Sequence, residues 1–262
     1  MKKPMIFINP EGCLQPEYGN VDDNHFAALA KISNWMRKGF SGVFDGLRLC
    51  SGKDRSSVEA IADDLGIVNC WQIIAGGAYF FNPTTRDIRP HPAINRKVER
   101  NFRKILKWKV PRILRRYPIL QYCPGEPTCI VIEKKRGTPA NIEKIHTVVI
   151  EREDLLAGWI RSGSIATTYS YNAIYIIPPM VSTGSAVKFL ADDLEEIDLS
   201  MSLAIGSSTT DIPLFRCVGR IGCPSNASSQ CQEAVKSRRG KVSLQHYAAG
   251  VADIIEDFLQ RE

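Results

Sequence analysis

The sequence predicts an α/β protein in which a doubly wound parallel sheet is interrupted by a smaller α+β domain. Short apolar runs alternate with helix-like segments near both ends of the chain. In the middle this rhythm gives way to proline-rich turns and closely spaced strand-like runs, and the same part carries the positive charge of the protein. We therefore predict a core domain of residues 1–82 and 180–262, with a cap domain of residues 83–179 inserted into it.

The first part of the chain alternates strands and helices. Apolar residues at helical spacing predict two helices, and Asp54 or Ser56 can cap the second. Three strand-like runs alternate with these helices, one before, one between and one after them, and each includes or is followed by a turn. Alternating strands and helices indicate parallel pairing with right-handed crossovers. The predicted strands are 5–8, 46–50 and 71–80, and the predicted helices are 25–40 and 54–67.

The same alternation resumes after the middle part. A helix is predicted at 184–194, a strand and turn at 201–211, a strand at 220–224 and a terminal helix at 248–260. The middle part predicts one basic amphipathic helix followed by strands. These elements are the helix at 94–110 and strands at 129–135, 146–154 and 172–179.

The charge of the chain is unevenly distributed. The 262 residues carry a formal net charge of +6, but residues 86–116 alone contain twelve Lys or Arg and two Asp or Glu. That segment is therefore +10 and the rest of the chain −4. Apolar residues of the 94–110 helix keep helical spacing, so its cations are expected on the outer face. Such a face can bind nucleic acid, an acidic protein or an anionic membrane, or it can simply be solvated.

Composition indicates an ordinary globular protein. No apolar run approaches the roughly 18 residues that span a bilayer, and no signal-peptide core precedes residue 9. The eight cysteines form no C-x-x-C pair and several lie inside apolar runs, so we expect reduced, mostly buried thiols. The four histidines are scattered, so zinc is not expected. We predict a cytoplasmic protein without a transmembrane segment.

Four segments in a fixed order carry the functional argument. They are "INPEGCL" (8–14), "LCSGK" (49–53), "PPMVSTGSAV" (178–187) and "AIGSSTTDIPLF" (204–215), and the cap lies between the second and the third. Together they resemble the motifs of the haloacid dehalogenase (HAD) superfamily of phosphohydrolases. The resemblance is to its capped branch of Cof-like proteins, sucrose phosphatases and mannosyl-3-phosphoglycerate phosphatases, and it extends over essentially the whole chain. It implies a Rossmann-like core with an α+β cap.

The first two motifs imply where the reaction centre would lie. In the family the first motif is D-x-D, whose first Asp attacks phosphorus and whose second acts as acid and base. Here Asn9 stands at the nucleophile position and Glu11 at the acid/base position. The second motif supplies Ser51, with Lys53 nearby, as contacts for phosphate oxygens.

The last two motifs also depart from the family pattern. Thr183 stands where the family has a phosphate-binding lysine, and Lys188 cannot be assumed to reach back. Ser207 replaces a metal-binding aspartate, whereas Asp211 is kept. Backbone N–H groups around Ser207 and Ser208 could hold an anion. Alternatively Ser208 or Thr209 caps the next helix, and Asp211 forms local hydrogen bonds.

The departures remove charge that this chemistry needs. An amide is a poor nucleophile, and Mg²⁺ prefers anionic oxygen ligands, which Asn9 and Ser207 no longer supply. We therefore expect no metal and no cofactor, with Mg²⁺ only if the family site were retained. The leading hypothesis is a pseudoenzyme that binds either a phosphorylated small molecule or phosphate in the cleft, or an anionic macromolecule at residues 86–116.

Three further expectations remain open at this point. Arg86 or Arg89, near the hinge of the cap, could contact an anionic group of a ligand. The first alternative function is an active phosphohydrolase of sugar phosphates or related monoesters, in which Glu11 activates water directly. The second is an interaction protein that binds nucleic acid or an acidic protein through the cationic cap helix.

Overall fold

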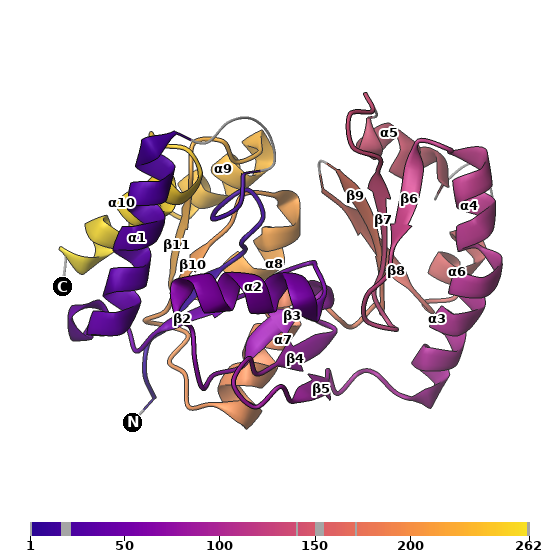
Figure 1. Cartoon of the computed structure of the whole chain (residues 1–262). Helices are drawn as coiled ribbons and strands as arrows, with labels where there is room; N and C mark the ends of the chain where they lie inside the picture. Colours follow the sequence, from indigo (N-terminus) through magenta and orange to yellow (C-terminus); the bar gives the residue numbers. More distant parts are fainter. Residues whose placement is uncertain (1, 17–21, 140, 150–154, 171, 261–262) are drawn as a thin grey trace.

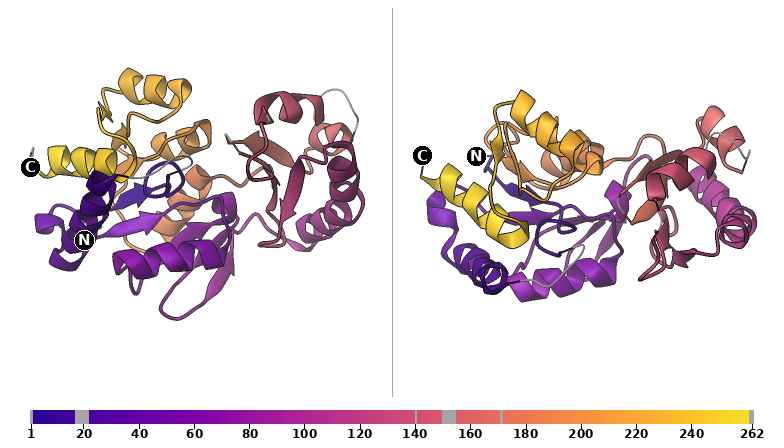
Figure 2. Two further views of the ribbon diagram at one scale, coloured as in Figure 1. Left: turned by 45° about the horizontal axis from the view of Figure 1, so that its top comes forward. Right: turned by 90° about the horizontal axis from the view of Figure 1, so that it is seen from above.

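The computed structural model describes residues 2–16, 22–139, 141–149, 155–170 and 172–260. It has two lobes joined by two connections (Figures 1 and 2). The larger lobe is built from the first and last parts of the chain, and the smaller lobe is the inserted cap. This arrangement confirms the predicted α/β class with a parallel sheet and a cap. In the described part of the chain, no helix has the length and apolar character needed to cross a membrane.

Five parallel strands form the central sheet in the order β12-β11-β10-β1-β2. Side chains alternate between its two faces: Ile6 and Ile8 of β1 pack with α1, α2 and α10, whereas Phe7 packs with α7, α8 and α9. Burial on both faces explains why the central strands β1 and β10 are apolar throughout. The strands are β1 (Ile6–Ile8), β2 (Leu47–Leu49), β10 (Leu203–Ile205), β11 (Arg220–Cys223) and β12 (Lys241–Val242). The helices are α1 (Asp23–Lys38), α2 (Arg55–Leu65), α7 (Thr183–Phe189), α8 (Ile212–Phe215), α9 (Ser229–Ser237) and α10 (Tyr247–Leu259).

Capping residues set the ends of the first two helices. The Asp22 carboxylate accepts from the backbone N–H of His25 at 3.0 Å, and α1 ends at Gly39 with φ of +73°. The Asp54 carboxylate accepts from the Ser57 N–H at 3.3 Å, so Asp54 rather than Ser56 caps α2. These side chains satisfy N–H groups that have no partner inside the helix.

A small antiparallel sheet lies beside the edge of the central sheet. It contains β3 (Gln72–Ile74), β4 (Tyr79–Phe81) and β5 (Ile88–Pro90), and Ile73 forms a parallel bridge with Cys50 beyond β2. The run 71–80, predicted as a strand and a turn, thus contains β3, a tight turn and the start of a second strand, β4. Because β5 pairs with β4, residues 83–90 belong with the larger lobe, and the first connection to the cap begins after β5 rather than at residue 83.

The cap is a four-stranded antiparallel sheet in the order β6-β7-β9-β8, with helices on its outer face (Figure 1). Alternate residues of β9 separate its two faces: Ile174 and Ile176 pack under the cap helices, and Tyr175 and Ile177 pack toward the larger lobe. The strands are β6 (Leu120–Cys123), β7 (Ile130–Lys134), β8 (Ala166–Tyr169) and β9 (Ala173–Ile177). The helices are α3 (Arg96–Trp108), α4 (Val110–Arg116), α5 (Ile142–Thr147) and α6 (Ala157–Arg161).

The cap contains β6, β8, α4 and α6, which were not predicted from the sequence, and it contradicts one predicted element. The run 146–154 was predicted as a strand, but α5 occupies 142–147, and residues 150–154 lie outside the described part. Asn141 caps this helix through the Lys144 N–H at 2.9 Å, and Ile142 and Val149 are buried in the apolar core of the cap. Capping and burial thus outweigh the strand propensity of the β-branched residues.

Candidate functional site

The candidate site lies where three parallel strands end side by side. Asn9 follows β1, Ser51 follows β2 by one residue, and Ser207 follows β10. The carboxyl ends of adjacent parallel strands share one edge of the sheet, which is where ligands bind in open α/β sheets. The structure thus brings together the residues that the sequence placed in separate segments, and Thr183 reaches the same edge from the start of α7.

Asn9 is paired directly with Asp211. The Asn9 amide Nδ2 donates to Asp211 Oδ1 at 2.8 Å, and Asn9 Oδ1 accepts from the backbone N–H of Glu11 at 3.2 Å. Both side chains are buried, with exposed fractions of 6% and 1%. The two contacts fix which end of the amide faces the carboxylate, since the reverse orientation would bring two acceptors together.

Asp211 is surrounded by further donors. Its Oδ2 accepts from the backbone N–H groups of Ser207 and Ser208 at 2.8 and 3.0 Å and from the Ser208 hydroxyl at 3.2 Å. Ser208 and Asp211 form a reciprocal cap at the following turn, so the predicted capping and local hydrogen bonding are confirmed. Gly206 permits this approach, because a Cβ there would lie 2.5 Å from the Cβ of Asp211. Burial raises the pKa of Asp211 above its ordinary value, although these hydrogen bonds act against the rise.

Glu11 points to the end of β2. The Ser51 hydroxyl, which is fully buried, donates to Glu11 Oε1 at 2.7 Å and itself accepts from the Lys53 N–H at 2.9 Å. Burial raises the pKa of Glu11, while the positive charge of Lys53 and the Ser51 hydrogen bond lower it. The backbone of Glu11 is also held, because the Ser207 hydroxyl donates to its carbonyl oxygen at 2.8 Å.

Thr183 brings no charge to the site. Its side chain is buried, and its hydroxyl donates weakly to the Thr210 carbonyl oxygen at 3.4 Å. Lys188 is exposed, five residues along α7, and is not among the described residues that line the cleft. The position that holds a lysine in the resembling family is thus occupied by a neutral hydroxyl group.

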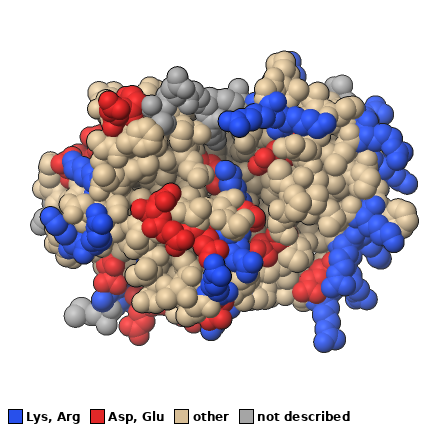
Figure 3. Space-filling model, viewed as in Figure 1, with Lys and Arg blue, Asp and Glu red and all other residues tan. Residues whose placement is uncertain are grey.

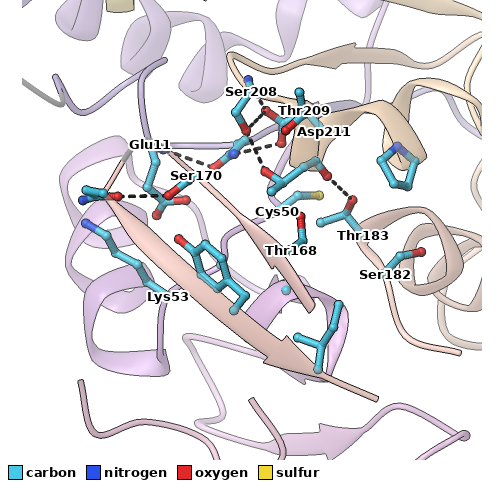
Figure 4. Close-up of a pocket in the computed structure, with 18 of the residues that line it drawn as sticks. Glu11, Cys50, Lys53, Thr168, Ser170, Ser182, Thr183, Ser208, Thr209 and Asp211 are labelled. Atoms are coloured by element: carbon cyan, nitrogen blue, oxygen red, sulfur yellow. Dashed lines mark hydrogen bonds between the residues drawn. The ribbon is translucent and has the colours of Figure 1, made fainter. Parts of the chain in front are cut away.

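Asn9, Glu11, Thr183, Ser208 and Asp211 line one wall of a cleft of about 310 Å³ between the two lobes, and Ser51 and Ser207 are not among its described lining residues. Figure 4 shows Glu11 and Lys53 on one side of this cavity and Ser208, Thr209 and Asp211 on the other. The charged residues among its described lining are Lys53 and the three carboxylates of Glu11, Glu133 and Asp211. The cleft is therefore rich in hydroxyl groups and carries more negative than positive groups.

The cap contributes lining residues that the sequence reasoning missed. They come from β7, β8, β9 and the β8–β9 turn, and they are Glu133, Thr168, Ser170, Asn172, Tyr175 and Ile177. For two of them the sequence does contain a signal. Side chains of a strand alternate between its faces, which places Tyr175 and Ile177 of β9 on the same face. That alternation shows which residues share a face but not what the face meets.

Arg86 and Arg89 do not have the predicted position. Both lie in the β4–β5 region of the larger lobe and neither is among the described residues lining the cleft. Arg86 forms an ion pair with Glu59 at 2.7 Å, and the Arg89 guanidinium lies 4.8 Å from the ring centre of Trp71. The prediction that they contact a ligand from the cap must be corrected, because β5 pairs with β4 outside the cap.

The side chains at the strand ends do not fit a divalent cation. Mg²⁺ requires several oxygen ligands, most of them anionic or neutral carbonyl oxygens turned toward it. Here an amide N–H group faces Oδ1 of Asp211, and the Ser207 hydroxyl is directed at a backbone carbonyl oxygen. Within the described ranges, no three His, Cys, Asp or Glu side chains are grouped so that they could hold a metal ion.

Comparison with known proteins adds a family match and a fold match. Residues 127–255 match the model of the haloacid dehalogenase-like hydrolase family. No curated protein matches the chain significantly. Among solved structures, a putative HAD/COF-like hydrolase from Plasmodium vivax has a TM-score of 0.71 at 12% identity, covering 100% of this chain and 97% of that one.

Two further solved structures share the fold over almost the full length. A protein from Thermoplasma acidophilum has a TM-score of 0.68 at 17% identity, covering 98% of this chain and 99% of that one. The sucrose-phosphatase from Synechocystis, solved with sucrose and phosphate, has a TM-score of 0.65 at 16% identity, covering 98% of each chain. At these identities the similarity establishes the fold and leaves function to the site.

Proposed function

Because this chain belongs to the haloacid dehalogenase-like hydrolases, with a capped phosphatase-type fold, we propose that it has kept the fold for binding and has lost aspartyl-phosphate chemistry. The Asn9–Asp211 hydrogen bond of 2.8 Å carries this proposal. Two carboxylates at that distance would need a shared proton or a cation between them, whereas an amide and a carboxylate satisfy each other.

The chemistry of the replaced groups supports the same proposal. The Asn9 oxygen is a neutral amide oxygen that accepts from Glu11, so it is weakly nucleophilic. Loss of a nucleophile costs about 10⁶ in rate in other covalent enzymes, which is about 8 kcal/mol of transition-state stabilisation. Thr183 and Ser207 provide neither the positive charge nor the metal ligand that would stabilise the transition state.

We expect no phosphate release above background from sugar phosphates or p-nitrophenyl phosphate, with or without Mg²⁺. The measurement is release of inorganic phosphate by the full chain and by Asn9→Ala and Glu11→Gln. Turnover that requires Mg²⁺ and disappears in Asn9→Ala would contradict the proposal. Turnover that survives Asn9→Ala but disappears in Glu11→Gln would instead support an active phosphohydrolase in which Glu11 activates water.

Charge decides between the two binding hypotheses. A phosphorylated small molecule in the cleft would meet one lysine, Lys53, among three carboxylates. Like charges placed together cost several kcal/mol, so this ligand class is less well supported. The cap offers an environment of opposite charge. It carries an excess of Lys and Arg, and most of these side chains are exposed.

The second candidate function is therefore binding of an anionic macromolecule by the cap. Phe102 and Ile105 of α3 are fully buried against the cap sheet, so the polar side of the helix faces solvent. Figure 3 shows Lys and Arg gathered over this end of the molecule. Trp108, 57% exposed, lies among them, with the Lys107 ammonium 5.0 Å from its ring centre. We define the cationic face as the exposed residues Arg96, Lys97, Arg100, Arg103, Lys104, Lys107, Arg112, Arg115 and Arg116.

We expect the full chain to bind a single-stranded RNA oligonucleotide through this face, with affinity that falls steeply as salt rises. The logarithm of the binding constant should fall by about 0.7 per logarithmic unit of salt for each phosphate contacted. Fluorescence anisotropy of a labelled oligonucleotide measures it, with polyglutamate as the competing acidic polymer.

A matched pair of triple variants controls for net charge. Arg100→Gln, Arg103→Gln and Lys104→Gln remove three cations of the cationic face and should weaken binding at least about tenfold. Lys38→Gln, Lys188→Gln and Lys236→Gln remove three exposed cations of the larger lobe and should have little effect. Equal losses from both triple variants, or binding insensitive to salt, would rule out the cap as the binding surface.

A cytoplasmic location of the protein stays a prediction.

A further inference from the structure

Ser51, Gly52 and Lys53 form a group of donors at the end of β2 that we call the oxyanion cradle. Gly52 and Lys53 line one side of the cleft, and the fully buried hydroxyl of Ser51 donates to Glu11, which also lines it. Because the Lys53 N–H donates to Ser51 Oγ, the hydroxyl proton is directed outward toward an acceptor. Two uncharged donors and one cation that converge at a strand end suit a tetrahedral oxyanion or a carboxylate.

The carboxylate of Glu11 fills this cradle. Oε1 accepts from the Ser51 hydroxyl at 2.7 Å, and the nearby Gly52 backbone N–H and the charge of Lys53 both favour the ionised carboxylate by lowering its pKa. Tyr175 of β9 closes the arrangement from the cap side. Its ring packs so tightly on Gly52 that a Cβ there would lie 2.8 Å from Cε1, and burial together with the charge of Glu11 raises the pKa of its phenol.

The two replaced positions hold Glu11 in place. Asn9 Oδ1 accepts from the Glu11 N–H at 3.2 Å, and the Ser207 hydroxyl donates to the Glu11 carbonyl oxygen at 2.8 Å. The backbone of Glu11 is therefore clamped from both β1 and β10, with its longer side chain aimed at the end of β2. Asn9 and Ser207, which stand at the nucleophile and metal-ligand positions of the family, thus share one role: both position the carboxylate of Glu11.

We infer that Glu11 is a built-in anion that occupies the oxyanion cradle and excludes phosphate and phosphate esters from it. A bound phosphate would have to displace the carboxylate from the Ser51 hydroxyl, beside Gly52 and Lys53, or lie against its negative charge. This inference goes beyond the proposed function, because it concerns what the cradle binds and not whether a bond is broken there.

The test is the binding of inorganic phosphate to the full chain. Wild type should show no saturable binding, whereas Glu11→Ala should bind phosphate at least about tenfold more tightly, since the vacated donors become available. Isothermal titration calorimetry and two-dimensional NMR shifts of the Gly52 and Lys53 amides would measure this. Circular dichroism would establish that each variant is folded.

Two variants make the result specific. Glu133→Ala removes another carboxylate of the same cleft without emptying the cradle, so it should not create the phosphate site. Adding Ser51→Ala to Glu11→Ala should remove most of the gained affinity. Wild type that binds phosphate as tightly as Glu11→Ala, or a folded Glu11→Ala that gains nothing over Glu133→Ala, would overturn the inference. Phosphate release from esters is measured separately, so either result leaves the proposed loss of catalysis independently testable.

Discussion

Replacing Asn9 with aspartate should destabilise the protein by about 3 kcal/mol and make its stability depend on magnesium. The change puts a second carboxylate against Asp211 Oδ1, where the amide now donates at 2.8 Å. The pair would bind a proton more tightly in the folded state than in the unfolded state, so one of its two pKa values would be raised above the unfolded value. The folded state would then keep its stability below the unfolded pKa of about 4 and lose it as pH rises through the raised folded pKa.

Chemical denaturation at several pH values, with and without millimolar MgCl₂, measures both effects. Asn9→Ala is the matched control, because it removes the same hydrogen bond without adding a charge. Its loss of stability should be insensitive to magnesium. If Asn9→Asp were as stable as wild type at neutral pH without magnesium, the prediction would be wrong. A second carboxylate would then be tolerated beside Asp211 without a bound cation.

Replacing Asp211 with alanine should cost about 3–5 kcal/mol of unfolding free energy. The carboxylate is almost fully buried and accepts from Asn9, from the Ser208 hydroxyl and from two backbone N–H groups. Removing it takes the acceptor from three N–H groups and from the Ser208 hydroxyl, which keeps its contact with the Thr210 hydroxyl, and each buried group left unsatisfied costs about 1–3 kcal/mol before relaxation. The same change also opens a small void beneath Gly206.

Urea denaturation compares this variant with Asp193→Ala, which removes an exposed aspartate elsewhere in the larger lobe. The exposed substitution should change stability by no more than about 0.5 kcal/mol. A loss below about 1 kcal/mol in Asp211→Ala would show that water replaces the carboxylate easily, and that the site is less tightly closed than its hydrogen bonds indicate.

The sequence was sufficient for the part of the site that lies on the parallel sheet. Strand ends in such a sheet meet at a common edge, so Asn9, Ser51 and Ser207 could be placed together from the order of the elements. The direction in which the side chains point could not be predicted in this way. That Asn9 and Ser207 both hold the backbone of Glu11 depends on rotamers and on contacts about 200 residues apart in the chain.

The cap was harder to predict because its contacts are antiparallel and its turns are irregular. The basic helix was expected at 94–110 and is found at 96–108, since its amphipathic pattern is strong. The Arg86 and Arg89 positions were wrong because nothing local in the sequence shows that β5 pairs back onto β4. The cleft residues on β8 and β9 were missed because strand register within a sheet depends on tertiary contacts.

Strand β9 has a consequence for how the cleft is reached. Tyr175 and Ile177 belong to the apolar cluster of the larger lobe, whereas Ile174 and Ile176 belong to that of the cap. Moving the lobes apart would therefore expose Tyr175 and Ile177 to water. Ile174 and Ile176, on the other face of β9, would stay buried in the cap. The barrier to admitting a solute is hydrophobic in origin, so it should respond to temperature and cosolvents more than to ionic strength.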